Sequence, residues 1–301
     1  MVDKSIWIRP SIDSDFRRWQ SGSTLYLCVV WRKLSLFSDE VLGIGVIELK
    51  QISVRYGDAV VALQPTSVTF RQGEFTVLLG ASGAGKSTLL RAINLLTPPS
   101  EGEVWIAGER VSHGPALRRH RRNTAMIFQQ HHLIKRHSAL RNTLAGRLGY
   151  YSSLRSFWPM GRQDRELALR CLDRVGLLDK ALARADHLSG GQQQRVGIAR
   201  ALAQQPRILL ADEPVASLDP SNAEQVMALL QRICREDGLT AIVSLHQLDL
   251  AKAFAQRIVA LQGGRVVFDG AAAELDEAVV ERIYRSPAAV SPVTESREGC
   301  E

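Results

Sequence analysis

Gly80-Ala81-Ser82-Gly83-Ala84-Gly85-Lys86-Ser87-Thr88 is the stretch that decides how this chain folds. It fits the pattern G-x-x-x-x-G-K-[ST], in which glycines let backbone N–H groups close around phosphate oxygens. The apolar run 75–79 before it predicts a buried strand, and residues 88–94 predict the start of a helix whose positive dipole end faces the anion. This order of strand, loop and helix predicts a nucleotide site, with Lys86 on the β- and γ-phosphates and Ser87 on Mg²⁺.

The composition of the 301 residues is that of a globular protein, 45% hydrophobic and 23% charged. The net charge of +7 favours an anionic ligand, an anionic membrane surface or nucleic acid, without choosing among them. We interpret the densest basic cluster, residues 118–122, as a solvated face. The four cysteines have neither metal-binding nor C-x-x-C spacing, which indicates a reducing compartment and no disulfide framework. No apolar stretch approaches the roughly 20 residues that span a bilayer, so we expect a cytoplasmic protein.

The chain is expected to fall into three parts. Residues 1–45 have no sustained periodicity and predict a poorly ordered N-terminal extension, with an interfacial anchor as the alternative because Trp7, Trp19 and Trp31 lie there. Residues 46–270 predict one nucleotide-binding domain, whose segment at about 131–188 is mainly helical. Residues 271–301 predict a C-terminal helix and a disordered tail.

Strand and helix patterns alternate along the predicted domain. Alternating residues at 47–54 and short runs at 102–111 predict a small antiparallel β subdomain beside the phosphate loop. Short apolar strands are expected at 124–128, 208–211 and 240–245, with helices between them. This alternation predicts an α/β fold with a mainly parallel sheet, and such sheets bind ligands at the carboxyl ends of their strands.

Two acidic residues, Asp212 and Glu213, follow the apolar run 208–211. Taken alone they would mark a strand leaving the core for solvent. After a phosphate loop, they are what Mg²⁺ and hydrolysis require at a strand end. We expect Asp212 to hold Mg²⁺, directly or through water, and Glu213 to polarise a water for in-line attack on the γ-phosphate.

These motifs, in this order, resemble those of the ATP-binding subunits of ATP-binding-cassette (ABC) transporters over about residues 46–270. Further stretches carry the resemblance: Leu188-Ser189-Gly190-Gly191-Gln192 is similar to the signature sequence, Ser217-Leu218-Asp219 to the D-loop, Gln129 to the Q-loop glutamine, His246 to the switch histidine and Tyr56 to an aromatic that stacks on adenine. The resemblance implies a P-loop NTPase cassette with a RecA-like core of mainly parallel sheet, an antiparallel β subdomain and a helical subdomain.

The resemblance also implies how the parts work together. Two copies would pair head to tail, so that ATP and Mg²⁺ on one P-loop meet Ser189, Gly190 and Gly191 of the other. His246 would hold the γ-phosphate and orient the water, and Gln129 would contact Mg²⁺ and relay closure to the helical segment. That segment would dock on a separate membrane permease, which works with an extracytoplasmic solute-binding protein. The chain would lie peripherally at the cytoplasmic face of the inner membrane, with no nucleic acid expected.

A finer resemblance, to the phosphonate-importer branch, rests on the stretches 144–149, 213–220 and 243–249. It implies import of phosphonates, although these residues do not touch the solute, so the substrate is inferred from kinship alone. An importer of phosphite, phosphate or another oxyanion remains an alternative function. An exporter's detached ATPase and a non-transport ABC ATPase acting on nucleic acid are further alternatives.

Overall fold

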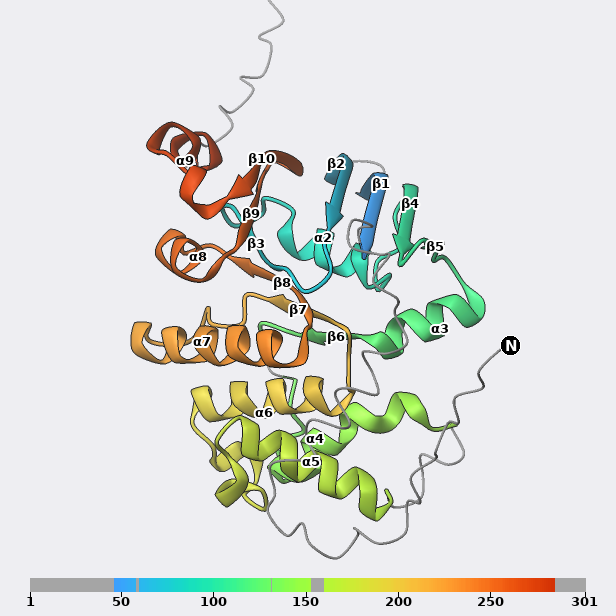
Figure 1. Cartoon of the computed structure of the whole chain (residues 1–301), viewed down its shortest axis with the longest axis vertical. Coiled ribbons are helices and arrows are strands. Elements are labelled where there is room, and N and C mark those ends of the chain that lie inside the picture. The colour runs from blue at the N-terminus through green and yellow to red at the C-terminus, as the bar shows by residue number, and fades with distance from the viewer. Residues whose placement is uncertain (1–45, 58–59, 131, 153–159, 285–301) are drawn as a thin grey trace, which may run out of the picture. The chain divides into compact units, whose positions relative to one another are not determined.

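The computed structural model describes residues 46–57, 60–130, 132–152 and 160–284 (Figure 1). The chain divides at residue 42 into two units, and all described residues belong to the second, Gly43–Glu301. The predicted N-terminal extension, residues 1–45, lies outside the described residues, as do residues 285–301 of the predicted tail.

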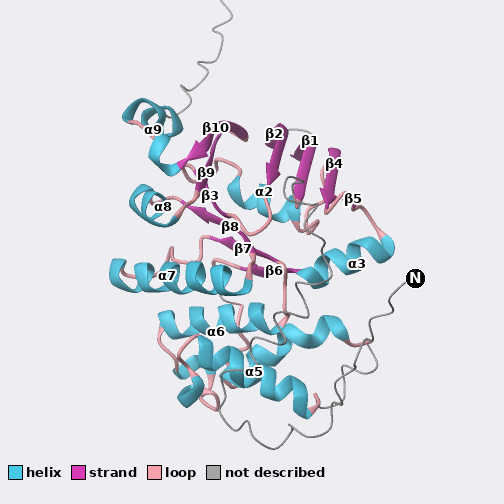
Figure 2. Ribbon diagram, in the orientation of Figure 1, coloured by secondary structure: helices cyan, strands magenta, loops and turns pink. Residues whose placement is uncertain are grey.

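A six-stranded sheet forms the centre of the described unit (Figure 2). Its order is β10-β9-β3-β8-β7-β6, and all neighbours are parallel except β9 and β10. The strands are β3 (Phe75–Leu79), β6 (Thr124–Ile127), β7 (Ile208–Asp212), β8 (Thr240–Leu245), β9 (Arg257–Gln262) and β10 (Arg265–Ala271). Every residue of β3, β7 and β8 is buried, because helices or a second sheet cover both faces of a parallel sheet. The predicted α/β fold with a mainly parallel sheet is confirmed.

A smaller antiparallel sheet has the order β2-β1-β4-β5. Its strands are β1 (Ile47–Tyr56), β2 (Val60–Phe70), β4 (Glu101–Ile106) and β5 (Glu109–Arg110). Strand β2 is continuous through Pro65. Pro65 lies between Leu63 and Thr66, where the register with β1 shifts, and proline is tolerated at such an irregularity of an edge strand. In β1 the register shifts between Leu49 and Ile52, and Gln51 has a φ of 50°, which marks a bulge.

Two apolar cores lie on the two faces of the central sheet. On one face, Leu78, Leu210 and Ile242 pack against α2 (Lys86–Ile93) and the small sheet. On the other face, alternate residues of the same strands pack against α6 (Gly190–Ala203), α7 (Pro220–Asp237), α8 (Leu248–Phe254) and α9 (Glu277–Tyr284). Each strand therefore contributes side chains to both cores, as the period of two requires.

The segment between β6 and β7 is helical, with α4 (Ala139–Leu144), α5 (Arg162–Arg174) and α6 packed on one another (Figure 1). Helix α5 ends just before Gly176, whose φ is 71°. The Gly176 N–H donates to the Asp173 carbonyl and the Leu177 N–H donates to the Leu172 carbonyl, each at 2.8 Å, which is the Schellman pattern. Helix α6 begins with a capping box, because Ser189 and Gln192 exchange side-chain and backbone hydrogen bonds.

The basic cluster 118–122 lies on α3 (Gly114–Asn123). Its arginines are exposed, but His120 is only 4% exposed, so the interpretation of the whole cluster as a solvated face is wrong for this residue. Nε2 of His120 donates to the Ile93 carbonyl at 2.8 Å, and its Nδ1 lies 3.2 Å from the Thr124 hydroxyl. Burial lowers the pKa of His120, which favours the neutral ring.

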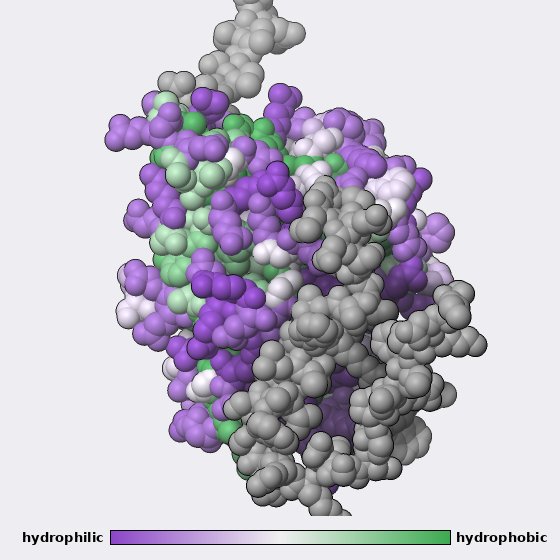
Figure 3. Space-filling view, in the orientation of Figure 1, coloured by the Kyte–Doolittle hydropathy of each residue, from purple (hydrophilic) through white to green (hydrophobic). Residues whose placement is uncertain are grey.

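Hydrophilic residues cover most of the described surface in the view of Figure 3. Among the helices that the structure describes, none combines the length and apolar character needed to cross a membrane.

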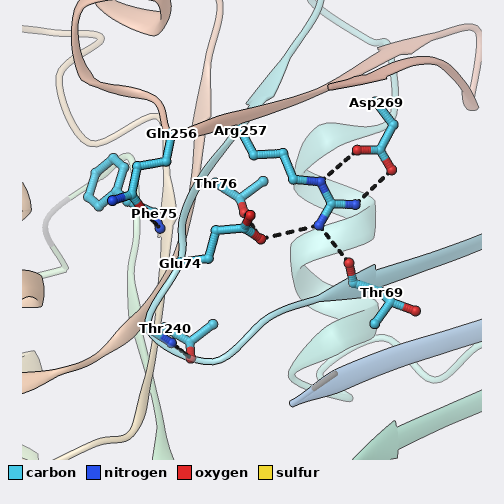
Figure 4. Close-up of polar contacts among 9 residues, drawn as sticks. Thr69, Glu74, Phe75, Thr76, Thr240, Gln256, Arg257 and Asp269 are labelled. Atoms are coloured by element: carbon cyan, nitrogen blue, oxygen red, sulfur yellow. Dashed lines mark hydrogen bonds and ion pairs between the residues drawn. The ribbon is translucent and has the colours of Figure 1, made fainter. Parts of the chain in front are cut away.

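Arg257 of β9 joins the two sheets, and Figure 4 shows its guanidinium between partners from several strands. It donates to both oxygens of Asp269 at 2.6 and 2.7 Å, to Glu74 at 3.2 Å and to the Thr69 carbonyl at 2.7 Å. Thr69 belongs to β2, so this one side chain binds the edge of the small sheet to the central sheet.

We expect Arg257→Ala to lower the free energy of unfolding by about 2 kcal/mol, because it leaves the largely buried Glu74 without its cation. Urea denaturation would measure the change. Arg162→Ala is the control: Arg162 is 92% exposed and its pair with Glu166 should contribute no more than about 0.5 kcal/mol. Equal effects of the two substitutions would contradict the structural role of Arg257.

Candidate functional site

The phosphate loop connects β3 to α2 through backbone that only glycine allows. Gly80 has a φ of 155°, and a Cβ there would lie 2.3 Å from the Leu261 carbonyl oxygen. Gly85, the residue before α2, has a φ of 103°, and its Cβ would lie 2.9 Å from the Ala62 carbonyl oxygen. At these two glycines the loop therefore packs closely against the backbone of β9 and β2, and its sequence pattern predicts that its remaining N–H groups line a cradle at the start of α2.

Lys86 is the first residue of α2 and is only 4% exposed. Its ammonium donates to the carbonyls of Gly80 at 2.8 Å and Ala81 at 3.0 Å. It also lies 3.6 Å from Oε1 of Glu213. Burial lowers the pKa of Lys86, and the neighbouring Glu213 and Asp212 partly oppose this effect. The loop therefore holds the ammonium where a bound phosphate would contact it.

The two acids occupy the carboxyl end of β7, as the sequence predicts. Asp212 is buried, and its Oδ1 accepts hydrogen bonds from the Ser87 hydroxyl at 2.7 Å and the Ser244 hydroxyl at 3.0 Å. Glu213 is partly exposed and has a φ of 45°, which is uncommon for a residue with a side chain. Its N–H donates to the Ser244 hydroxyl at 2.9 Å. Sequence reasoning missed Ser244, whose only signal is a hydroxyl inside a buried apolar strand.

His246 and Gln129 follow the ends of two other strands at the same edge. His246 comes directly after β8, and its Nδ1 lies 3.7 Å from Oε2 of Glu213. Its carbonyl accepts a hydrogen bond of 2.9 Å from the Tyr284 hydroxyl of α9. Gln129 is exposed and lies two residues beyond β6, whose Ile127 is the register partner of Ala211. The edge therefore gathers side chains from β6, β7 and β8 around the phosphate loop.

The remaining predicted residues lie apart from this cluster. Ser189 and Gly190 are exposed at the start of α6, and Asp219 is exposed at the start of α7. Among the described residues, no hydrogen bond or ion pair joins the stretch 189–192 to Lys86, Asp212 or Glu213. Tyr56, the last residue of β1, is 45% exposed. The predicted residues therefore form separate groups within one chain.

The oxygen atoms of this edge fit a Mg²⁺ ion bound together with a nucleotide. The Ser87 hydroxyl and the Asp212 carboxylate adjoin, and both are ligands of the type that this ion prefers. Within the described ranges, no group of three or more His, Cys, Asp or Glu side chains could form a metal site by itself. Such a pair suits an ion whose other ligands are phosphate oxygens and water.

The cradle, the buried lysine and the acids at the strand ends define a P-loop ATPase of the cassette type. Residues 63–216 match the model of the ABC transporter family, and the chain belongs to that family. As a member it uses nucleotide and hydrolyses ATP.

Three comparisons show how close the similarity is. The chain is 60% identical over 239 residues to the phosphonates import ATP-binding protein PhnC 3 of Nostoc sp. strain PCC 7120, which covers 79% of this chain and 91% of that protein. It is 58% identical to the phosphite import ATP-binding protein PxtA of Stutzerimonas stutzeri, over 84% of this chain and 92% of that one. Among solved structures, the dimeric post-hydrolysis state of the cassette MJ0796 bound to ADP and Pi is 36% identical, with a TM-score of 0.66 over 75% of this chain and 98% of that chain.

We expect Lys86→Ala to weaken ATP binding by at least about 10-fold, because the β- and γ-phosphates lose their buried cation. Isothermal titration calorimetry with ATP measures the effect directly. Lys252→Ala, which removes an exposed lysine from α8, should bind ATP as the wild type does. Tight ATP binding by the Lys86 variant would remove this residue from the phosphate site.

Proposed function

We propose that this chain is the ATP-hydrolysing subunit of an ABC importer for phosphonates. Its high identity to import ATPases for phosphonates and phosphite, over most of each chain, is the observation that carries the choice of solute. The same similarity favours transport over a nucleic-acid ATPase. The chain would act peripherally, at the cytoplasmic face of the membrane that holds its permease.

The residues around the phosphate loop would each perform one part of the hydrolysis. The Lys86 ammonium would exchange its two carbonyl acceptors for charged phosphate oxygens, which are stronger acceptors. Ser87 and Asp212 would hold Mg²⁺, which when bound neutralises charge on the transferring phosphoryl group. Residues 80–88 would cradle the phosphates, and half-exposed Tyr56 would stack on the adenine.

Glu213 is the residue best placed to accept a proton from the attacking water. Its carboxylate lies between Lys86 and His246, at 3.6 and 3.7 Å. A phosphate that engages Lys86 would free this carboxylate for the water, and His246 would orient the water against the γ-phosphate. Gln129, at the same edge, would contact Mg²⁺ and report its presence to the helical segment.

The predicted residues at the start of α6, which lie apart from the phosphate loop, support a head-to-tail homodimer. The exposed start of α6 presents the Ser189 hydroxyl and the N–H groups of Gly190 and Gly191, next to Gln192 and near the exposed Asp219 of the neighbouring helix. A helix N-terminus of this kind favours an anion. Because nothing in the described chain brings its own P-loop to this point, the γ-phosphate on a second copy would complete it.

A basic groove on the helical side supports docking on a permease. The groove, a hollow of ≈ 460 Å³, lies between α3, the turn Ala145–Tyr150 and α6. Its lining includes Arg118, Arg121, Arg122 and Arg200. The charge predicts that the cytoplasmic segment of the permease that docks here is acidic.

The function is tested by solute uptake in cells whose only copy is the wild type or Glu213→Gln. We expect the variant to lose methylphosphonate uptake while phosphate uptake stays intact. Loss of phosphite uptake alone would assign the chain to the phosphite alternative. Glu236→Gln, an exposed change on α7, should transport as the wild type does.

In the purified protein, Glu213→Gln should keep ATP binding, accumulate as a dimer and turn over at least ~100-fold more slowly.

Docking is tested by charge reversal in the basic groove. We expect Arg118→Glu to abolish co-purification with the permease, while the ATPase rate of the purified subunit stays within about twofold of the wild type. Arg235→Glu reverses an exposed charge on α7, outside the groove, and should co-purify normally. Binding of DNA by the wild type, lost in the Arg118 variant with permease binding unchanged, would instead support the nucleic-acid alternative.

A further inference from the structure

Ser244 is a polar residue inside the most deeply buried part of the central sheet. Every residue of β8 is buried, and Ser244 itself is 0% exposed. Its register partners are Asp212 on β7 and Leu78 on β3. A buried hydroxyl is unfavourable unless it is hydrogen-bonded. The hydrogen-bond partners of Ser244 therefore indicate its role.

Both hydrogen bonds of the Ser244 hydroxyl reach the two acids of the site. Its Oγ donates to Oδ1 of Asp212 at 3.0 Å and accepts the N–H of Glu213 at 2.9 Å. A serine hydroxyl has a single proton, and an ionised carboxylate and an N–H group cannot exchange roles. The direction of both bonds is therefore fixed, and one oxygen atom lies between the side chain of Asp212 and the backbone of Glu213.

The bond to Asp212 holds the carboxylate from the side of β8. Oδ1 also accepts from the Ser87 hydroxyl at 2.7 Å, on the side of α2. The carboxylate is thus clamped between two hydroxyls from different elements. If Mg²⁺ binds Ser87 and Asp212, the Ser244 hydroxyl is the partner that keeps the carboxylate oriented, in the manner of the groups behind the direct ligands of a metal.

The bond to Glu213 supports a turn that an L-residue adopts reluctantly. Glu213 has a φ of 45°, in the left-handed region that favours glycine. This turn directs the carboxylate to Lys86 and His246, at 3.6 and 3.7 Å. Without its acceptor the Glu213 N–H would lack a partner next to the buried Asp212, and the turn would lose a restraint.

We propose that Ser244 is a positioning residue, whose one hydroxyl fixes the metal-binding carboxylate of Asp212 and the turn of Glu213 as a single unit. This inference rests on the roles proposed above for Asp212 and Glu213. It adds that the two roles are coupled through a fully buried side chain on the neighbouring strand β8.

Ser244→Ala tests the coupling with little change of volume. We expect the affinity for Mn²⁺ in the presence of a non-hydrolysable ATP analogue, followed by electron paramagnetic resonance, to fall by about 5- to 10-fold. The kcat for ATP hydrolysis should fall by a similar factor. ATP affinity without metal should stay within about twofold, because the contacts of the phosphate loop are unchanged. Mass-spectrometric hydrogen exchange should be faster in the peptide that contains Glu213.

Two matched variants separate positioning from simple loss of stability. Ser244→Thr keeps the hydroxyl and should recover most of the Mn²⁺ affinity. Thr240→Val removes another buried hydroxyl of β8, the acceptor of the Gly73 N–H at 3.0 Å, whose side chain is drawn in Figure 4. It should lower stability and leave Mn²⁺ affinity unchanged.

Wild-type Mn²⁺ affinity and kcat in Ser244→Ala would overturn the inference, as would an equal loss of Mn²⁺ affinity in Thr240→Val. If Glu213→Gln is inactive while Ser244→Ala behaves as the wild type, only the coupling fails and the proposed roles of the acids stand. Wild-type turnover by Glu213→Gln would overturn both.

Discussion

The register of three parallel strands is the constraint on which the rest of the structure depends. Pairing of β8 with β3 and β7 sets Leu79 beside Leu245 and Asp212 beside Ser244. The carboxyl ends of parallel strands lie at one edge of the sheet. The residues that follow these strands therefore meet there, although they are far apart in the sequence. A slip of one residue in β7 would turn Asp212 toward the opposite core, away from Ser87. The two apolar cores exclude that slip, since it would also exchange their side chains.

The charged groups of the site contact one another. The buried Lys86 is compensated by two carbonyls and by Glu213, which in turn faces His246. Burying an ammonium is costly, and these partners recover part of that cost. The phosphates of a nucleotide would bring a stronger anion to Lys86. Nucleotide binding would therefore be linked to the release of Glu213 from this lysine.

Most of the features that the sequence predicted correctly depend on local patterns. The phosphate loop, the acids after β7 and the capping box of α6 are contiguous stretches, and their geometry follows from short-range rules. Ser244 was missed because its partners lie on another strand, about thirty positions away in the chain. The burial of His120 was missed for the same reason, since the packing of Ile93 and Thr124 around it is not visible in a run of arginines. A single sequence does not show which residues become neighbours across strands.

Gly264 links the phosphate loop to the small sheet through two main-chain hydrogen bonds. The Gly264 N–H donates to the Ala84 carbonyl at 3.0 Å, and the Gln64 N–H donates to the Gly264 carbonyl at 2.8 Å. A Cβ on Gly264 would lie 2.9 Å from the Ala62 carbonyl oxygen. Gly264 also has a φ of 76°, so even the smallest side chain there would press on the backbone of β2 and strain the connection between the loop and the small sheet.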